Sequence, residues 1–313
     1  MFEIVFLGTS ASAPSIHRGL SAQVVMHNEH RFLIDCGEGT QRQILQSGIG
    51  FKRLERVLIT HGHLDHILGL AGLVSTFTRW ETAERLEIWA GRWALQRIQT
   101  LLNEIVLKGA RLPFPLSFHE IKPGQIFADR SFSVTAFPVS HRGSDSFGFL
   151  FEERTRRPFL VEQAEALGVP AGPVRRTLAS GQPITLADGR QVSPDQVLGP
   201  EERGVKFVHV GDCGDTRDLV KIARGADALV IESTYLQEEA EMAHEFGHLT
   251  ATQAATLARE AGVGHLLLTH ISRRHRERDV VEEAQRTFPN TFVARDFDQF
   301  RVLRGETCKI VDA

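Results

Sequence analysis

Residues 56–66 read RVLITHGHLDH, and this short segment carries more structural information than any other part of the chain. Its first half is an apolar run that predicts a buried strand. Its second half places four potential metal ligands within six residues, namely His61, His63, Asp65 and His66. Imidazole and carboxylate groups at this spacing suit zinc or a similar divalent ion. Four ligands from so short a loop crowd one tetrahedral site, which favours two ions. The alternative is a polar loop whose histidines only cap a strand and a helix.

The composition is that of an ordinary globular protein. The 313 residues are 42% hydrophobic and 24% charged, which fits one large α/β domain or two smaller ones. Cys36, Cys213 and Cys308 have no paired spacing, so we expect no disulfide framework and a reducing compartment. The first residues lack a basic segment, and no apolar run approaches the ~20 residues that cross a bilayer. We therefore expect a cytoplasmic protein without a membrane partner. The net charge of −3 neither indicates nor excludes a nucleic-acid partner.

Strand and helix patterns alternate along most of the chain. The segment between residues 26 and 31 predicts a hairpin, and Thr40 is the expected N-cap of a helix that follows it. A further helix is expected from residue 67, which would place His66 in its first turn. The segments 116–121 and 132–139 are expected to be neighbouring strands. The other predicted elements are strands at 3–7, 23–26, 31–34, 86–90, 205–210, 228–231 and 264–269, and a helix at 250–261.

Four apolar strands are followed directly by a polar residue, at His61, His141, Asp212 and His270. A sheet that carries a site along one edge produces this repetition. We therefore expect a two-metal site. His61, His63 and His141 would hold one ion, and Asp65, His66 and His270 the other, with Asp212 as the bridge between them. Asp65 could also accept a proton from the attacking water.

The segment 152–200 differs from the rest. It holds six of the twelve prolines, together with Arg154, Arg156, Arg157, Arg175 and Arg176. Its only strong periodicity predicts a short helix at 161–167. We interpret the segment as an excursion from the core with its own turns, and the alternative is a floppy surface insertion.

Several blocks of the sequence resemble those of the metallo-β-lactamase superfamily and, more specifically, of the short form of ribonuclease Z. They are 6–9 (FLGT), 33–41 (LIDCGEGTQ), 167–173 (LGVPAGP), 230–234 (VIEST), 247–250 (GHLT) and 268–273 (LTHISR). The resemblance implies an α/β protein with a four-layer αββα fold. It also implies that residues 1–313 form a single domain, with a protruding tRNA-binding arm inserted at about 152–197, and that the protein is a homodimer. Two positions depart from the family pattern, because Leu64 stands where a glycine is usual and His275 where a tyrosine is usual.

The resemblance also implies an activity and residue roles. The protein would be a zinc-dependent endoribonuclease that cuts the 3′ trailer from precursor tRNA, leaving a 3′-hydroxyl on the tRNA and a 5′-phosphate on the trailer. It would hold two divalent ions per subunit, with zinc expected and manganese or another ion as the alternative. Asp65 would accept a proton, and His248, oriented by Glu232, would protonate the leaving oxygen. The residues implied in binding the substrate are Gly172, Pro173, Arg175 and Arg176.

Two alternatives remain open at this point. The first is another hydrolase of the superfamily, acting on a small phosphodiester, a sulfate ester or a thioester. The second is an adaptor that binds metal without turnover. The segment 152–200 favours the tRNA enzyme over the first, and the complete set of Asp65, Glu232 and His248 disfavours the second.

Overall fold

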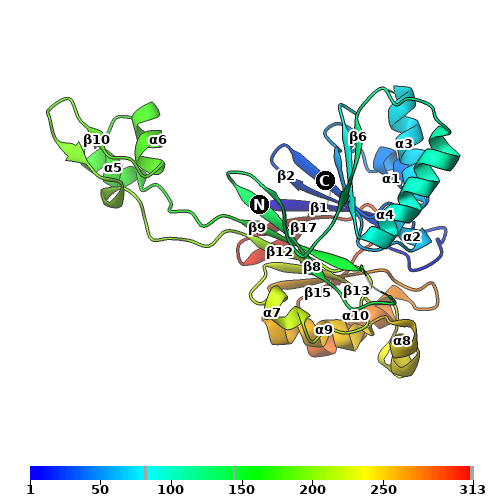
Figure 1. The fold of residues 1–313 in the computed structure, drawn as a ribbon. Helices are drawn as coiled ribbons and strands as arrows, with labels where there is room; N and C mark the ends of the chain where they lie inside the picture. The colour runs from blue at the N-terminus through cyan, green and yellow to red at the C-terminus, as the bar shows by residue number, and fades with distance from the viewer. Residues whose placement is uncertain (81–82, 144, 311–313) are drawn as a thin grey trace. The chain divides into compact units, whose positions relative to one another are not determined.

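A computed structural model describes residues 1–80, 83–143 and 145–310. The chain divides into two compact units, of which the larger comprises Met1–Glu152 and Val205–Ala313 and the smaller Glu153–Gly204. Within the larger unit, two sheets pack face to face and helices cover both outer faces (Figure 1). This arrangement confirms the predicted four-layer αββα fold.

The first sheet has eight strands in the order β17-β16-β1-β2-β3-β4-β5-β6. The strands are β1 Phe2–Gly8, β2 Ala22–His27, β3 His30–Ile34, β4 Arg56–Leu58, β5 Leu86–Ala90, β6 Leu116–Glu120, β16 Gln299–Leu303 and β17 Glu306–Ile310. Strands β3 to β6 run parallel, so their connections cross the outer face as helices. These helical segments are α1 Thr40–Gln46, α2 Leu64–Ile67, α3 Gly69–Trp80, α4 Arg92–Gln99 and the π-helix η1 Thr100–Leu107.

The second sheet has seven strands in the order β15-β14-β13-β12-β9-β8-β7. The strands are β7 Gly124–Ala128, β8 Phe132–Pro138, β9 Phe147–Glu153, β12 Lys206–His209, β13 Ala228–Glu232, β14 His265–Thr269 and β15 Thr291–Val293. Its helices are α7 Leu219–Ala223, η3 Gln237–Glu239, α8 Ala240–Phe246, α9 Ala251–Ala261 and α10 Glu277–Thr287. Strands β12 to β15 are parallel, so the ends of β12 and β14 that carry polar residues lie at the same edge.

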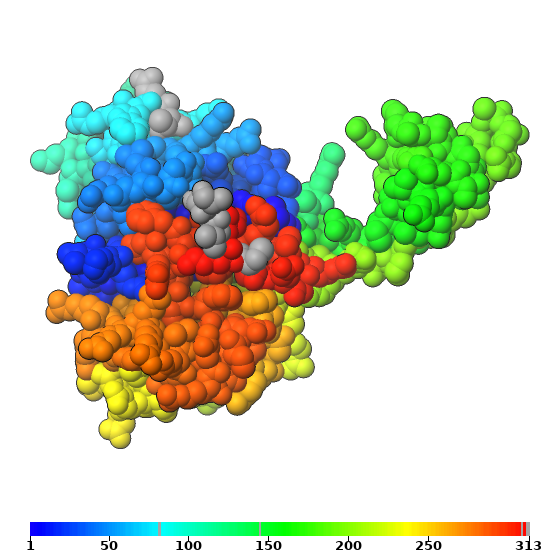
Figure 2. All heavy atoms as spheres, turned by 180° about the vertical axis from the view of Figure 1, so that it is seen from behind, coloured from blue at the N-terminus to red at the C-terminus, as the bar shows by residue number. Residues whose placement is uncertain are grey.

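Phenylalanine side chains fill the space between the two sheets. Phe2, Phe132, Phe151 and Phe207 are fully buried and contact one another through tilted and edge-to-face ring pairs. Residues from the first half of the chain and from its last third pack against each other in this unit, as the blue-to-cyan and orange-to-red atoms of Figure 2 show. This packing explains how ligands distant in the sequence can meet at one edge.

The structure confirms most of the predicted elements and corrects three expectations. The hairpin is present, with β2 and β3 antiparallel. Thr40 is not an N-cap: it is the first helical residue, its hydroxyl donates to the Gly37 carbonyl, and Gly39 caps the helix in a left-handed conformation (φ 83°) that suits glycine. The helix expected from residue 67 begins earlier, as α2, so His66 lies in its last turn.

The third correction concerns sheet membership. The segments 116–121 and 132–139 are not neighbouring strands, because β6 is the edge of the first sheet and β8 belongs to the second. The sequence analysis missed β7, which lies between them in the chain and forms the antiparallel partner of β8.

The smaller unit has its own secondary structure and its own core. It contains α5 Val161–Ala166, α6 Pro173–Ala179, the two-stranded sheet of β10 Ile184–Thr185 and β11 Gln191–Val192, and the 3-10 turn η2 Pro194–Gln196. The residues that form its core are Ala164, Val169, Leu178, Val192 and Val197. The predicted helix at 161–167 is α5. Gly172 caps α6 with a φ of 121°, which only glycine adopts easily, and Pro173 occupies the first helical position.

Among the residues that the structure describes, no helix combines the length and the apolar character that crossing a membrane requires.

Candidate metal centre

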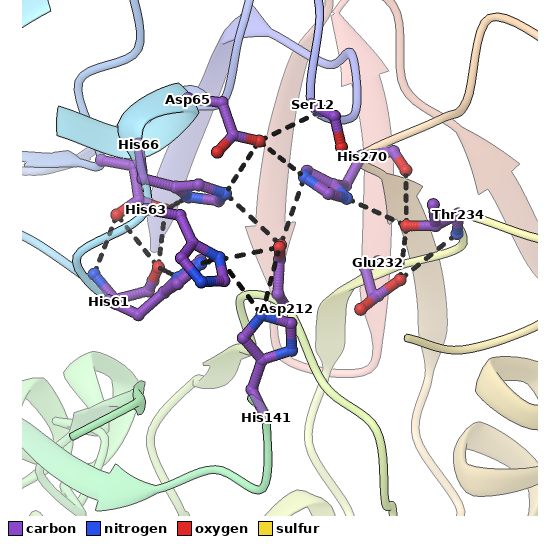
Figure 3. Close-up of polar contacts among 12 residues, drawn as sticks. Ser12, His61, His63, Asp65, His66, His141, Asp212, Glu232, Thr234 and His270 are labelled. Atoms are coloured by element: carbon purple, nitrogen blue, oxygen red, sulfur yellow. Dashed lines mark hydrogen bonds and ion pairs between the residues drawn. The ribbon is translucent and has the colours of Figure 1, made fainter. Parts of the chain in front are cut away.

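The seven predicted metal ligands meet at one edge of the two facing sheets (Figure 3). Four come from the first sheet, where β4 leads into a loop with His61 and His63, and the short helix α2 follows with Asp65 and His66. Three come from the second sheet, where His141, Asp212 and His270 follow β8, β12 and β14. The repetition of polar residues after apolar strands therefore identified the edge where the side chains converge.

The ligand atoms form two groups that share Asp212. In the first, Nε2 of His61 lies 2.8 Å from Nδ1 of His63, and Nε2 of His141 lies 3.4 Å from the same Nδ1. In the second, Oδ2 of Asp65 lies 3.6 Å from Nε2 of both His66 and His270.

Asp212 faces each group with a different oxygen. Its Oδ2 is 3.7 Å from His61 and 3.9 Å from His141. Its Oδ1 is 3.5 Å from His66 and 3.3 Å from His270. A carboxylate in this position can bridge two cations. The structure thus divides the ligands into the same two groups that the sequence analysis expected.

Two buried carboxylates determine which ring nitrogens face the centre, and Asp35 serves the histidines of the first sheet. It accepts from Nδ1 of His66 at 2.8 Å and from the Thr60 hydroxyl at 2.9 Å. The Thr60 oxygen in turn lies 3.1 Å from Nδ1 of His61. Both imidazoles are thereby held with the proton on Nδ1, which leaves the lone pair of Nε2 free for a metal ion.

Glu232 serves the histidines of the second sheet in the same way. It accepts from Nδ1 of His248 at 2.8 Å and from the Thr234 hydroxyl at 2.6 Å, and that oxygen lies 2.9 Å from Nδ1 of His270. His141 is oriented separately by the Gly247 carbonyl, 2.7 Å from its Nδ1. The sequence analysis found Glu232 but missed Asp35, Thr60 and Thr234. The only signal for Asp35 and Thr234 was their place in blocks that resemble the family.

The donor set fits divalent cations. Nε2 of His66 and Nε2 of His270 are buried and have no hydrogen-bond partner among the described residues. Burial would raise the pKa of Asp212, but His270, His66 and His61 outweigh it and hold that pKa well below the usual range. Buried carboxylates without a nearby Lys or Arg require a compensating positive charge. Convergent imidazole and carboxylate groups are the ligands that zinc prefers.

Backbone conformation at two of these positions is unusual. His270 and Asp35 have φ values of 56° and 57°, in the left-handed region that non-glycine residues rarely occupy. Such conformations cost of order 1–3 kcal/mol and persist where the surroundings impose them. Both residues belong to the centre or orient its ligands, so the strain lies where a precise side-chain direction is needed.

The remaining two catalytic candidates also lie here. Asp65 accepts from the backbone N–H of Ser12 at 3.0 Å through Oδ2, and its Oδ1 makes no hydrogen bond within the described part of the chain. His248 lies 3.9 Å from Asp212 through the same Nδ1 that contacts Glu232. Burial would lower the pKa of His248, but the Glu232 carboxylate outweighs it and raises that pKa to about 9.

The two departures from the family pattern leave the candidate ligand set intact. Leu64, between two ligands, is 49% exposed. Nε2 of His275 lies 2.8 Å from a carboxylate oxygen of Glu239. Neither residue displaces a ligand.

The four candidate substrate-binding residues lie in the smaller unit, at the start of α6. Gly172, Pro173 and Arg176 are exposed. Arg175 differs, because its guanidinium contacts Glu165 and the Val169 carbonyl inside the same unit. Glu153–Gly204 contains seven arginines and seven acidic residues, so the unit is not basic overall.

Comparisons with known proteins place the chain among hydrolases. A family model described as Anti-Pycsar protein Apyc1 matches residues 2–158, and one described as beta-lactamase superfamily domain matches residues 172–271. A Ribonuclease Z from Bradyrhizobium sp. (strain ORS 278) is 46% identical, covering 96% of this chain and all of its own length. One from Gemmatimonas aurantiaca is 39% identical over 96% of both. The crystal structure of the short form of human tRNase Z superimposes with a TM-score of 0.68 at 27% identity, covering 96% of this chain and 99% of its own.

These comparisons cover different shares of the chain. Each family model matches only one part of the chain, whereas the relatives match nearly its whole length. The relatives therefore decide the family.

Replacing Asp35 tests how ligand orientation depends on the buried carboxylates. Asp35→Asn keeps the shape of the side chain and tolerates the left-handed backbone, but it removes the charge that orients His66 directly and His61 through Thr60. We expect the affinity for divalent ions to fall about 10–100-fold, measured by competition with a chromophoric chelator. The control is Asp129→Asn, since Asp129 caps a turn between β7 and β8. Equal affinities in the two variants would contradict the expected role.

Proposed function

This chain belongs to the ribonuclease Z family, and from that premise we propose that it is a zinc-dependent endoribonuclease that removes the 3′ trailer from precursor tRNA. The observation that carries the proposal is Asp212, whose two oxygens face two separate ligand groups beside the His248–Glu232 pair. This arrangement suits hydrolysis of a phosphodiester.

The proposed metal sites follow the two ligand groups. His61, His63 and His141 would hold one ion, Asp65, His66 and His270 the other, and Asp212 would contact both. Two divalent ions there would provide an activated water molecule near neutral pH and neutralise charge on the phosphate. Five imidazoles and two carboxylates favour zinc, and manganese or another divalent ion is the alternative.

Asp65 and His248 are proposed to move the protons. Oδ2 of Asp65 is held by the N–H of Ser12, so Oδ1 is left to accept a proton from the attacking water. Attack at phosphorus breaks the bond to the 3′ oxygen, and His248 would give that oxygen its proton. The tRNA then keeps a 3′-hydroxyl and the trailer a 5′-phosphate. Glu232 receives five hydrogen bonds, from the N–H groups of residues 213, 234 and 249, the Thr234 hydroxyl and the His248 ring, so it holds His248 rigidly.

The smaller unit, Glu153–Gly204, is the proposed tRNA-binding arm. Arg154, Arg156 and Arg176 are exposed and make no side-chain ion pair within the described residues, so their guanidinium groups are available to phosphate. The arginines and acidic residues of the unit cancel, so its formal net charge is zero. Binding would therefore depend on where these three guanidinium groups lie rather than on the net charge of the unit. Recognition of tRNA shape and backbone fits such an arrangement. Arg175 would act differently, as an internal support for α6.

A different substrate is the competing proposal. The metal centre contains no group specific to tRNA, so a small phosphodiester, a sulfate ester or a thioester would fit the same ligands. The matched family model over residues 2–158 covers the ligand loop and His141 but not the smaller unit beyond Pro158. The presence of that unit favours the tRNA substrate.

Incubation with a labelled precursor tRNA tests the activity itself. We expect one cut at the 3′ side of the tRNA, loss of cutting after metal removal with a chelator, and recovery with zinc. Asp212→Ala should lose activity by at least about 100-fold and bind fewer ions, measured by elemental analysis. We also propose that the protein is a homodimer. Light scattering on the same sample tests this, because a dimer has twice the 34.9 kDa mass of one chain. Cutting that survives complete metal removal would refute the proposed chemistry.

The proposed role of His248 as the acid can be tested with a substrate whose leaving group departs without a proton. His248→Gln should slow pre-tRNA cleavage by about 100-fold or more, because the 3′ oxygen leaves poorly as an alkoxide. It should slow bis(p-nitrophenyl) phosphate hydrolysis much less, since p-nitrophenolate leaves unprotonated. The control is His244→Gln, an exposed histidine on α8. Equal losses on the two substrates would show that His248 does not act as the acid.

Removing the smaller unit separates the two substrate proposals. Arg156 and Glu202 face each other as an antiparallel bridge, so replacing residues 157–201 with Asn-Gly closes the chain there as a tight hairpin. We expect kcat/KM for pre-tRNA to fall by at least about 100-fold while bis(p-nitrophenyl) phosphate is still hydrolysed. Comparable activity on both substrates would remove the main support for the tRNA assignment. Metal content identical to that of the intact chain is the control for folding.

A further inference from the structure

A hollow of about 440 Å³ lies beside the loop that carries the metal ligands. Its volume is in the range of small-molecule sites. Four large apolar side chains in its lining are exposed to solvent, with Leu64 at 49%, Leu68 at 38%, Trp93 at 41% and Ile105 at 65%. The other lining residues come from α2, α4 and η1: Ile67, Gln96, Arg97, Thr100 and Leu101. Exposed apolar side chains gathered beside polar groups are a candidate binding surface.

Two local features place Trp93 beside the candidate metal centre. A Cβ atom at Gly62 would lie 2.8 Å from a Trp93 ring carbon, so the glycine between the two ligand histidines leaves room for the indole. Oδ2 of Asp145, four residues after His141, accepts from the Trp93 backbone N–H at 2.9 Å. Asp145 therefore anchors the backbone at Trp93, and the exposed ring lies with its centroid 6.1 Å from that of His63.

The hollow carries one charged residue in its lining, and that charge is positive. The Arg97 guanidinium lies 5.0 Å from the Trp93 ring centre and donates to the Gly62 carbonyl at 2.7 Å. Arg92, the residue before Trp93, is exposed and has no ion-pair partner within the described part of the chain. An aromatic ring with an arginine beside it is the combination that binds single-stranded RNA, because bases stack on the ring and phosphates pair with the guanidinium group.

We propose that this hollow binds a base of the single-stranded RNA next to the scissile phosphate, stacked on Trp93. The inference rests on the proposed function and adds a subsite to it. The contact between Trp93 and His63 supports this occupant, because a nucleotide stacked there has its phosphate beside the ligand groups. Arg97 provides the complementary charge. Leu64 forms part of the wall, so Gly62 and the departure at Leu64 together shape the subsite in this chain.

The first test compares two substrates. Trp93→Ala should lower kcat/KM for pre-tRNA, relative to that for bis(p-nitrophenyl) phosphate, by about 10-fold or more. Trp93→Phe keeps an aromatic face and should lose much less, whereas Trp93→Leu fills the space without stacking and should lose as much as Trp93→Ala. The matched control is Trp80→Ala, an exposed tryptophan on α3 that packs on Phe51. Metal content must equal that of the wild type in each variant.

The outcomes separate this inference from the proposed function. If the wild type cuts pre-tRNA and Trp93→Leu retains the wild-type ratio, the stacking subsite is refuted while the proposed function stands. If the wild type does not cut pre-tRNA, both fail. If light scattering shows that Trp93→Ala changes the particle mass together with the ratio, the hollow is occupied by a second copy of this chain and the inference is overturned.

A binding measurement completes the test. The chain has three tryptophans, so fluorescence can be assigned with single Trp→Phe variants. A phosphorothioate-linked oligoribonucleotide that spans the cleavage site should quench the fluorescence of Trp80→Phe but leave that of Trp93→Phe much less affected. Equal quenching of both variants would contradict a base stacked on Trp93.

Discussion

The structure depends on a buried negative charge that five imidazoles surround. Asp212 is 4% exposed and ends a strand in the middle of the second sheet, where its oxygens face histidines from both sheets. A buried carboxylate in this position is unfavourable unless positive charge compensates it. Two divalent ions, both contacting Asp212 and one also contacting Asp65, would supply that charge. Metal binding would therefore stabilise the packing of the two sheets at this edge as well as enable chemistry. The fold and the proposed reaction share one electrostatic requirement.

The same hydrogen-bond pattern orients ligands on both sides of the centre. Asp35 holds one histidine directly and a second through Thr60, and Glu232 does the same through Thr234. A threonine can serve in this way because its hydroxyl donates to the carboxylate while its oxygen accepts from the imidazole. On the second side the pattern joins His248 to His270. The proposed acid and a proposed ligand are thus coupled, so a change at Glu232 would affect both.

The sequence was sufficient to predict which side chains converge, but among the groups that orient them it identified only Glu232. A histidine or aspartate directly after an apolar strand is visible in the chain, and parallel strands bring such positions together. Thr60 and Thr234 look like ordinary strand-end residues in the sequence, because their role depends on distant partners. Thr60 contacts Asp35, 25 residues away. Thr234 contacts His270, which follows the neighbouring strand β14. Sheet membership was similarly hidden, since two strand patterns close together in the chain do not reveal which sheet each one joins, and β6 and β8 join different sheets. Charge was misleading in the smaller unit, where paired acids cancel the arginines and Arg175 is turned inward.

Substrate choice must come from groups outside the metal centre. Two cations and a water molecule would act on any accessible phosphodiester, so the proposed ligands would contribute rate rather than discrimination. Discrimination requires contacts that one substrate makes and another lacks. The exposed arginines of Glu153–Gly204 and the ring of Trp93 would supply such contacts, each of modest strength, with stacking worth about 1–3 kcal/mol per base. Several contacts of this size acting together can select a large RNA over a small ester while the chemistry at the centre stays the same. Gly62 illustrates how closely the two functions are joined, because the residue that separates two ligands also positions the ring that would select the substrate.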